Sequence, residues 1–262
     1  MKSGVLFLCS GLGDILFSQK IAHYIQSLGY TVHWPVLPQY GWLSDYIDNY
    51  NFISDSQSYY IRGQGLILPE HVVFPGKEYY SINTDTQITE DLFFYQGFRW
   101  YRDRHPLVMK AKYDMIDLDF EDWREYIKFT RNKSKEDSLY YDILGLKDGE
   151  EYVFVNRQYG TFEGDIYNKI PVDKSYYGCK VIDMSTIPGY SIFDWCKVFE
   201  NCREINMVET SLNYLLESPE LFDKIKTKKL TLHHRNTGAA ESRHLWCEVD
   251  YLFKLPWTYI MG

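Results

Sequence analysis

The pattern of apolar and polar positions near the N-terminus predicts a βαβ unit. The apolar run Val5–Cys9 predicts a first strand, which ends in the turn Ser10–Gly13. Apolar residues then recur at helical spacing, at Ile15, Ala22, Ile25 and Leu28. Gly29 is expected to end that helix, and the β-branched and aromatic stretch Tyr30–Trp34 predicts a second strand. A strand, a helix and a strand in this order indicate a parallel sheet.

A second alternating series occupies the C-terminal half. Strands are predicted over Tyr152–Asn156, Lys180–Met184, Glu204–Val208 and Leu230–His234. Ser191, with Asp194 three residues later, predicts a capped helix start, and Thr210–Leu216 has helical spacing. The polar turn Asp148–Glu151 separates the two series. We therefore expect an α/β protein with one domain over residues 1–148 and a second over residues 149–262.

Shorter elements are predicted between these series. Helices are expected near Gly41–Tyr50 and over Glu90–Trp100, Glu121–Thr130 and Ser138–Leu144, and a strand is expected over His71–Phe74. Aromatic side chains on and just after the second of these helices form either a packed helix face or an aromatic wall for a ligand. They are Tyr95, Phe98, Trp100 and Tyr101.

Composition and charge narrow the class of protein. The chain has 262 residues, enough for two buried cores, and its net charge of −8 argues against a broad nucleic-acid interface. Five cysteines form no CxxC pair, which favours a reducing compartment. No apolar run approaches the ~20 residues of a membrane span, so we expect a cytoplasmic protein without one. No zinc-type ligand spacing occurs, and neither a metal nor a cofactor is expected.

The glycine-containing turn does not match the common nucleotide motifs. Gly11 and Gly13 follow the first predicted strand, but the third glycine of a dinucleotide-binding motif would fall at Leu16. The second strand ends in His33, Trp34 and Pro35, with no acid to bind a ribose. No Gly-Lys-Ser/Thr of a phosphate loop follows either. An oxidoreductase is therefore disfavoured.

Asp14 is the candidate catalytic residue of this turn. Ligands of α/β sheets bind outside the carboxyl ends of the strands, and Asp14 follows such an end. Its carboxylate there is suited to accept a proton from a hydroxyl group. Gly11 and Gly13 have no side chains, so a substrate can approach the backbone there, and Ser10 is a further candidate residue of the same loop. The alternative is an acid that only stabilises the helix N-terminus.

The stretch SGLGDILFSQKIAHYIQSLGYTVHW resembles the start of GT-B glycosyltransferases, especially of the heptosyltransferase-like group. The resemblance implies two Rossmann-like domains that face each other across a cleft. It also implies that Asp14 is the catalytic base. The later stretch REINMVETSLNYLLE resembles the strand, turn and helix that hold the diphosphate of the donor in these enzymes.

The resemblance assigns donor-binding roles in the second half. Arg157, after the strand in VFVNRQYGT, is expected to contact phosphate, and Gly160 to leave space for it. Glu209, Thr210 and Ser211 form the diphosphate turn. Alternatively, Arg157 is only a surface arginine, and Thr210 or Ser211 only caps the following helix. Arg235, after a strand that ends in two histidines, is a further candidate for the diphosphate.

These observations favour a glycosyltransferase. It would move a sugar from a nucleotide-diphosphate donor to a glycan or other hydroxyl acceptor, with inversion and without a metal. Two alternatives remain open, a non-catalytic protein that binds a nucleotide or glycan, and a sugar-nucleotide epimerase. The oxidoreductase comes last. The expected partners are the nucleotide sugar and the glycan acceptor, without nucleic acid or membrane.

Overall fold

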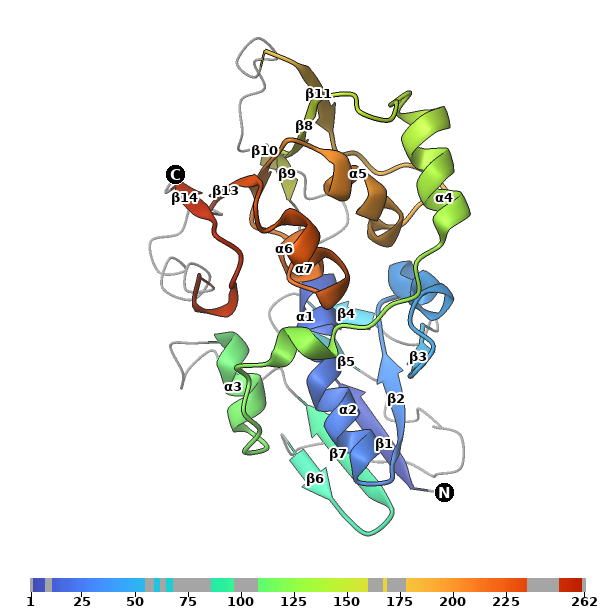
Figure 1. Ribbon diagram of the computed structural model, residues 1–262. Helices are drawn as coiled ribbons and strands as arrows, with labels where there is room; N and C mark the ends of the chain where they lie inside the picture. Colours follow the sequence, from blue (N-terminus) through green and yellow to red (C-terminus); the bar gives the residue numbers. More distant parts are fainter. Residues whose placement is uncertain are drawn as a thin grey trace. The chain divides into compact units, whose positions relative to one another are not determined.

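The chain folds into two compact units of mixed α/β structure, Met1–Thr130 (unit 1) and Arg131–Gly262 (unit 2) (Figure 1). The computed structural model describes residues 2–7, 11–54, 59–61, 65–67, 86–96, 108–159, 167–168, 178–234 and 250–260. Each unit is built on a largely parallel sheet, which confirms the predicted α/β class.

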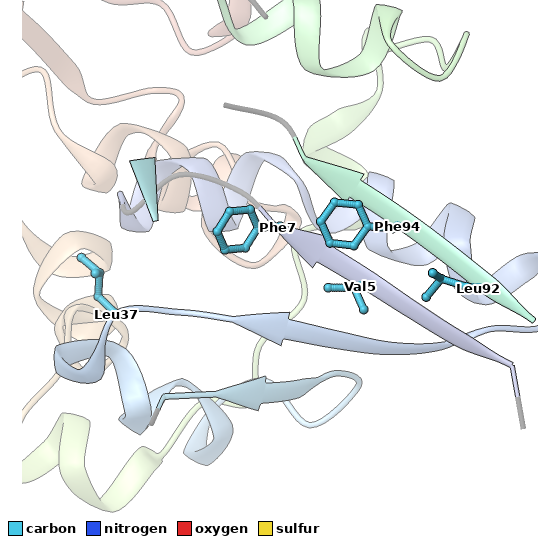
Figure 2. Packing of buried hydrophobic residues seen from close by; sticks show 5 residues of the cluster. All are labelled: Val5, Phe7, Leu37, Leu92 and Phe94. Carbon is cyan, nitrogen blue, oxygen red and sulfur yellow. The ribbon is translucent and has the colours of Figure 1, made fainter. Parts of the chain in front are cut away.

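The described strands of unit 1 form one main sheet. They are β1 (Ser3–Phe7), β2 (Thr31–Pro35), β3 (Asn51–Ile53), β6 (Thr86–Ile88) and β7 (Leu92–Gln96), in the spatial order β3-β2-β1-β7-β6. All pairs are parallel except β6 with β7. Strand β1 is buried along its whole length because it lies at the centre. On one face of the sheet, Val5 and Phe7 of β1 pack with Leu37, Leu92 and Phe94 (Figure 2).

Helices α1 (Leu12–Phe17) and α2 (Gln19–Ser27) follow β1 and correspond to the predicted first helix, interrupted at Ser18. Helix α2 packs on β1 and β2 (Figure 1). Gly29 has φ +87°, a left-handed conformation that ends the helix as predicted. The other described elements of unit 1 are η1 (Pro38–Asp45), β4 (Tyr59–Ile61), β5 (Gly65–Ile67), α3 (Val108–Asp114) and η2 (Trp123–Tyr126).

The main sheet of unit 2 is parallel throughout its described strands. These are β8 (Tyr152–Asn156), β11 (Lys180–Asp183), β12 (Glu204–Val208), β13 (Lys229–His233) and β14 (Thr258–Ile260), in the order β11-β8-β12-β13-β14. The smaller strands β9 (Gln158–Tyr159) and β10 (Tyr167–Asn168) form an antiparallel pair. The helical segments are α4 (Lys133–Asp137), η3 (Ser138–Ile143), η5 (Ile192–Trp195), α5 (Cys196–Asn201), α6 (Ser211–Leu216), α7 (Pro219–Ile225) and η6 (Asp250–Leu252).

A buried carboxylate attaches β14 to the rest of unit 2. Glu217, directly after α6, accepts hydrogen bonds from the backbone N–H groups of Lys254 and Leu255, at 3.0 and 2.9 Å. The side chain of Glu217 is fully buried, so these bonds replace its lost hydration. They hold the chain before β14 where this strand can pair with β13.

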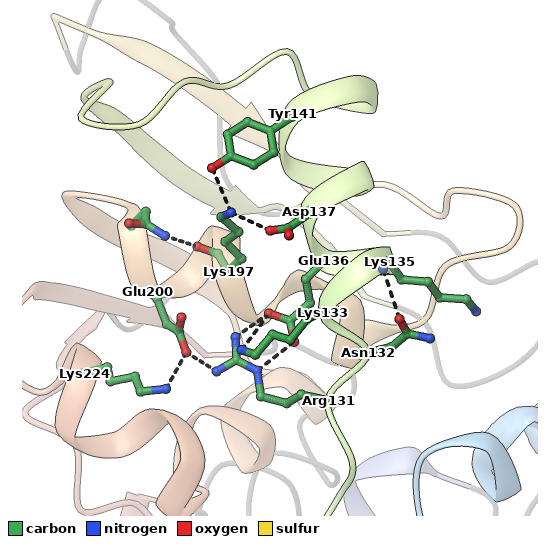
Figure 3. Close-up of polar contacts among 11 residues, drawn as sticks. Arg131, Asn132, Lys133, Lys135, Glu136, Asp137, Tyr141, Lys197, Glu200 and Lys224 are labelled. Atoms are coloured by element: carbon green, nitrogen blue, oxygen red, sulfur yellow. Dashed lines mark hydrogen bonds and ion pairs between the residues drawn. The ribbon is translucent and has the colours of Figure 1, made fainter.

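An ion-pair network explains why unit 2 begins at Arg131. The guanidinium of Arg131 pairs with Glu136 of α4 and with Glu200 of α5, and Lys224 of α7 reaches Glu200 at 2.7 Å (Figure 3). Residues 131–148 therefore belong to unit 2, whereas the boundary predicted from the sequence lies between residues 148 and 149. The polar turn Asp148–Glu151, from which the later boundary was predicted, is the connection from η3 to β8.

Two predicted helices are wrong. Glu90–Trp100 contains strand β7, and Glu121–Thr130 contains only the short 3-10 turn η2. Strand β7 is buried on both faces, so its apolar run has no alternation that would mark it as a strand. The ring of Tyr95 is fully buried, which is the packed alternative. Phe98, Trp100, Tyr101 and the predicted strand His71–Phe74 lie outside the described residues.

Candidate functional site

Each main sheet has a point at which its strand order reverses. In unit 1 the chain runs outward from β1 to β2 and β3, and β7 then lies on the opposite side of β1. In unit 2 the chain runs from β8 to β11, and β12 then lies on the opposite side of β8. The carboxyl ends of strands at such a reversal form the usual ligand-binding edge of an α/β sheet. The candidate residues can be placed against these two edges.

Asp14 lies at the carboxyl edge of β1, in the first turn of α1. Its Oδ1 forms an ion pair with Nζ of Lys112, which comes from α3. The side chain of Lys112 is only 1% exposed, and that of Asp14 is 22% exposed. The carboxylate is therefore open to a ligand on one side and fixed by a buried ammonium on the other.

Gly11 is the N-cap residue of α1, with φ −87° and ψ 139°. A Cβ atom on Gly11 would lie 2.7 Å from Oδ2 of Asp14, closer than side-chain atoms tolerate. The absence of a side chain at Gly11 thus makes room for the second oxygen of the carboxylate. Gly13, also predicted, is the second residue of α1 and is half-buried.

The phenol of Tyr40, in η1, also lies near this carboxylate. Burial raises the pKa of Tyr40, hydrogen bonding to Gln39 lowers it, and the negative charge of Asp14 raises it further. The phenol therefore remains protonated at neutral pH. Tyr40 and Lys112 were both missed in the sequence, because each is brought to Asp14 only by the fold.

Arg157 of unit 2 lies beyond the end of β8, as the sequence predicted. Its guanidinium pairs with Asp183 at the end of β11, and this hydrogen bond raises the pKa of Arg157. The neighbouring Asn156 donates a hydrogen bond of 3.4 Å from Nδ2 to Oγ1 of Thr210. The carboxyl ends of β8, β11 and β12 are thus joined at the reversal point of this sheet.

Thr210 caps helix α6. Its Oγ1 accepts a hydrogen bond from the Leu212 N–H at 3.3 Å, and its own N–H donates to Oδ1 of Asn213 at 2.8 Å. This reciprocal arrangement is a capping box. The structure therefore gives Thr210 the capping role that was its alternative in the sequence. Ser211 is the first residue of α6 and is half-buried.

Glu209 lies next to Thr210 and faces a histidine. Its Oε2 is 3.9 Å from Nδ1 of His234, and the ring of His234 stacks on Tyr259 with 5.4 Å between the ring centroids. Both Glu209 and His234 are buried. His233 contacts Oδ1 of Asn206 through Nε2 at 2.9 Å. Polar side chains thus follow the ends of β12 and β13 as well.

Ser10, Gly160 and Arg235 lie outside the described residues. Within the described ranges, no cluster of three or more His, Cys, Asp or Glu side chains is arranged to hold a metal ion. Among the helices that the structure describes, none is long and apolar enough to cross a membrane.

Comparison with known proteins agrees with the two-sheet architecture. No protein-family model matches the chain, and no curated protein matches it. Among solved structures, it is similar to the crystal structure of the glycosyl transferase family 9 from Veillonella parvula DSM 2008. The two share 9% sequence identity with a TM-score of 0.52, over 100% of this chain and 86% of that chain. At 9% identity this similarity shows the fold alone. The fold is mixed α/β, with two largely parallel sheets.

Proposed function

We propose that this protein is a glycosyltransferase that uses a nucleotide-diphosphate sugar as its donor. The observation that carries the proposal is the carboxylate of Asp14, which is accessible at the ligand-binding edge of the sheet of unit 1. The similarity of the whole chain to a family 9 glycosyl transferase supports the same class. We assign the acceptor to unit 1 and the donor to unit 2.

In the proposed reaction, Asp14 acts as a general base. An acceptor hydroxyl transfers its proton to the carboxylate while its oxygen forms a bond to the anomeric carbon of the donor. The bond from that carbon to the diphosphate oxygen breaks, and the nucleoside diphosphate leaves. Direct displacement of this kind inverts the anomeric centre.

Arg157 is proposed to stabilise the leaving diphosphate. Its fork of N–H groups suits two phosphate oxygens, and it stands at the reversal point of the second sheet. Asp183 holds the guanidinium in place before a ligand arrives. Glu209, Ser211, Gly160 and Arg235 are proposed to complete the donor site. Thr210 supports it by fixing the turn between β12 and α6.

The first experiment measures hydrolysis and transfer with a panel of UDP-, GDP- and ADP-linked sugars. We expect turnover by the wild type and a loss of about 100-fold or more in Asp14→Asn, because the amide cannot accept the proton. The matched control is Asp48→Asn, which changes an exposed aspartate of the same unit and should leave turnover unchanged.

Thermal-shift measurements separate the alternatives, since a ligand that binds only the folded protein raises its melting temperature. Stabilisation by UDP or GDP with turnover supports the proposal. Stabilisation without any turnover points to a non-catalytic binding protein. Interconversion of two nucleotide sugars points to an epimerase, and stabilisation by NAD alone points to an oxidoreductase. Each of the last three results contradicts the proposed function.

A further inference from the structure

We propose that Lys112 is a positioning residue that holds Asp14 in the orientation needed for proton transfer. This inference rests on the proposed function. Lys112 is far from Asp14 in the sequence, and nothing in the pattern of α3 marks it out from its neighbour Lys110. Two features of the pair support this role: a ligand can reach only Asp14, and Lys112 is fixed by its surroundings.

The ion pair is unequally exposed. A ligand can reach Asp14, whose side chain is 22% exposed, but not Lys112, whose side chain is 1% exposed. Lys112 therefore cannot act directly on a substrate at this edge. Any influence that it has on the reaction passes through the carboxylate of Asp14.

Lys112 fixes one of the two carboxylate oxygens. Its Nζ contacts Oδ1 of Asp14, while Oδ2 lies in the space that a side chain on Gly11 would fill. Rotation of the carboxylate would break the charge-assisted hydrogen bond to the ammonium. The pair thus leaves Oδ2, above the glycine, as the oxygen that accepts the proton.

The backbone of Lys112 is held against β7, and its ammonium contacts another residue of α3. The carbonyl oxygen of Lys112 accepts a hydrogen bond of 2.9 Å from the hydroxyl of Tyr95, a fully buried residue of β7. Nζ also contacts Sδ of Met109 at 3.2 Å. Strand β7 pairs directly with β1, with Phe7 opposite Gln96. The lysine is therefore delivered to the end of β1 by rigid elements rather than by a surface loop.

The test compares Lys112→Met with the control Lys110→Met. Methionine keeps the length and apolar stem of the lysine without its charge, and Lys110 pairs with Asp114 at 2.5 Å on a more exposed part of the same helix. Donor hydrolysis and transfer are measured for both variants. We expect kcat of Lys112→Met to fall at least about 10-fold, because a misplaced catalytic group costs rate. The KM for the donor should stay within about twofold, since binding is unaffected.

Chemical rescue distinguishes positioning from a structural role. In Lys112→Ala, n-propylammonium replaces the atoms that were removed and should restore part of kcat. Tetramethylammonium has the same charge but no N–H group, and should not. A kcat for Lys112→Met within twofold of the wild type overturns the positioning role, as does equal rescue by both cations. If the wild type turns over no donor, the proposed function falls and this inference falls with it.

Discussion

The ion pair between Asp14 and Lys112 makes a sharp prediction about stability. Asp14→Asn leaves the ammonium of Lys112 buried beside a neutral amide. Removing one partner of a buried ion pair costs about 3–5 kcal/mol. Because Asp14 is partly exposed, water can approach the site, and we expect the lower end of this range, about 3 kcal/mol.

The reverse change is expected to be milder. Lys112→Met leaves a carboxylate that retains contact with water and lies in the first turn of α1, where the helix dipole favours a negative charge. We expect a loss of about 1 kcal/mol. The double variant has no uncompensated charge, so it should be more stable than Asp14→Asn alone by about 2 kcal/mol.

Urea denaturation combined with hydrogen exchange of the β1 and β7 amides measures this cycle. The exchange step is needed because a chain of two units need not unfold in a single transition. An Asp14→Asn variant as stable as the wild type, or one that Lys112→Met destabilises further, would refute the role of the uncompensated ammonium. The cycle also supplies a folded reference without a carboxylate, so that inactivity of Asp14→Asn can be separated from unfolding.

Three further predictions concern other buried groups. Arg131→Met removes the buried ion-pair partner of the Glu136 carboxylate. It should lower the free energy of unfolding of unit 2 by about 3 kcal/mol, measured by urea denaturation. Burial raises the pKa of Cys202 to about 12, so native protein treated with iodoacetamide should be labelled at Cys179 and not at Cys202 in peptide mass spectra. Burial lowers the pKa of His33 in the folded protein. Just below pH ~6.5 the unfolded chain therefore binds more protons than the folded protein. The free energy of unfolding, measured by denaturation, should fall as the pH drops through that window.

Each of these three predictions has a control variant or a result that would contradict it. Lys133→Met removes an exposed charge near the same Glu136 and should change stability by less than ~0.5 kcal/mol. Complete labelling of Cys202 without denaturant would show that the core around α5 opens readily. For His33, the variant His33→Gln should flatten the fall in stability between pH ~6.5 and the lowered pKa. An unchanged slope would assign that fall to other groups.

Much of unit 2 was predictable from the sequence. Strands β8 and β12 were predicted with their observed ends, because parallel strands buried on both faces are short apolar runs bounded by polar turns. The capping box of Ser191 and Asp194 is confirmed by hydrogen bonds of 3.2 Å to Ser191 Oγ and 2.7 Å to the Asp194 carboxylate. These signals are local, so each is specified by residues that are close together in the sequence.

The candidate site was less predictable, for a physical reason. The position of Asp14 at the end of β1 follows from a local pattern of strand, glycine turn and helix. Its ion-pair partner, Lys112, comes 98 residues after Asp14, and no local pattern specifies such a contact. The same limit explains the wrong helix at β7, whose apolar run became a strand because β1 and β6 pair with it.

The reversed strand β6 has a consequence for the size of the protein. Three residues, Thr89, Glu90 and Asp91, connect β6 to β7, and the turn is closed by a hydrogen bond of 2.7 Å from the Thr89 N–H to the Leu92 carbonyl. A parallel strand at this place would need a crossover of about a dozen residues or more, usually with its own helix. The hairpin therefore adds the edge strand β6 to this sheet with only three connecting residues. Such economy is one way in which 262 residues can build two separate sheets.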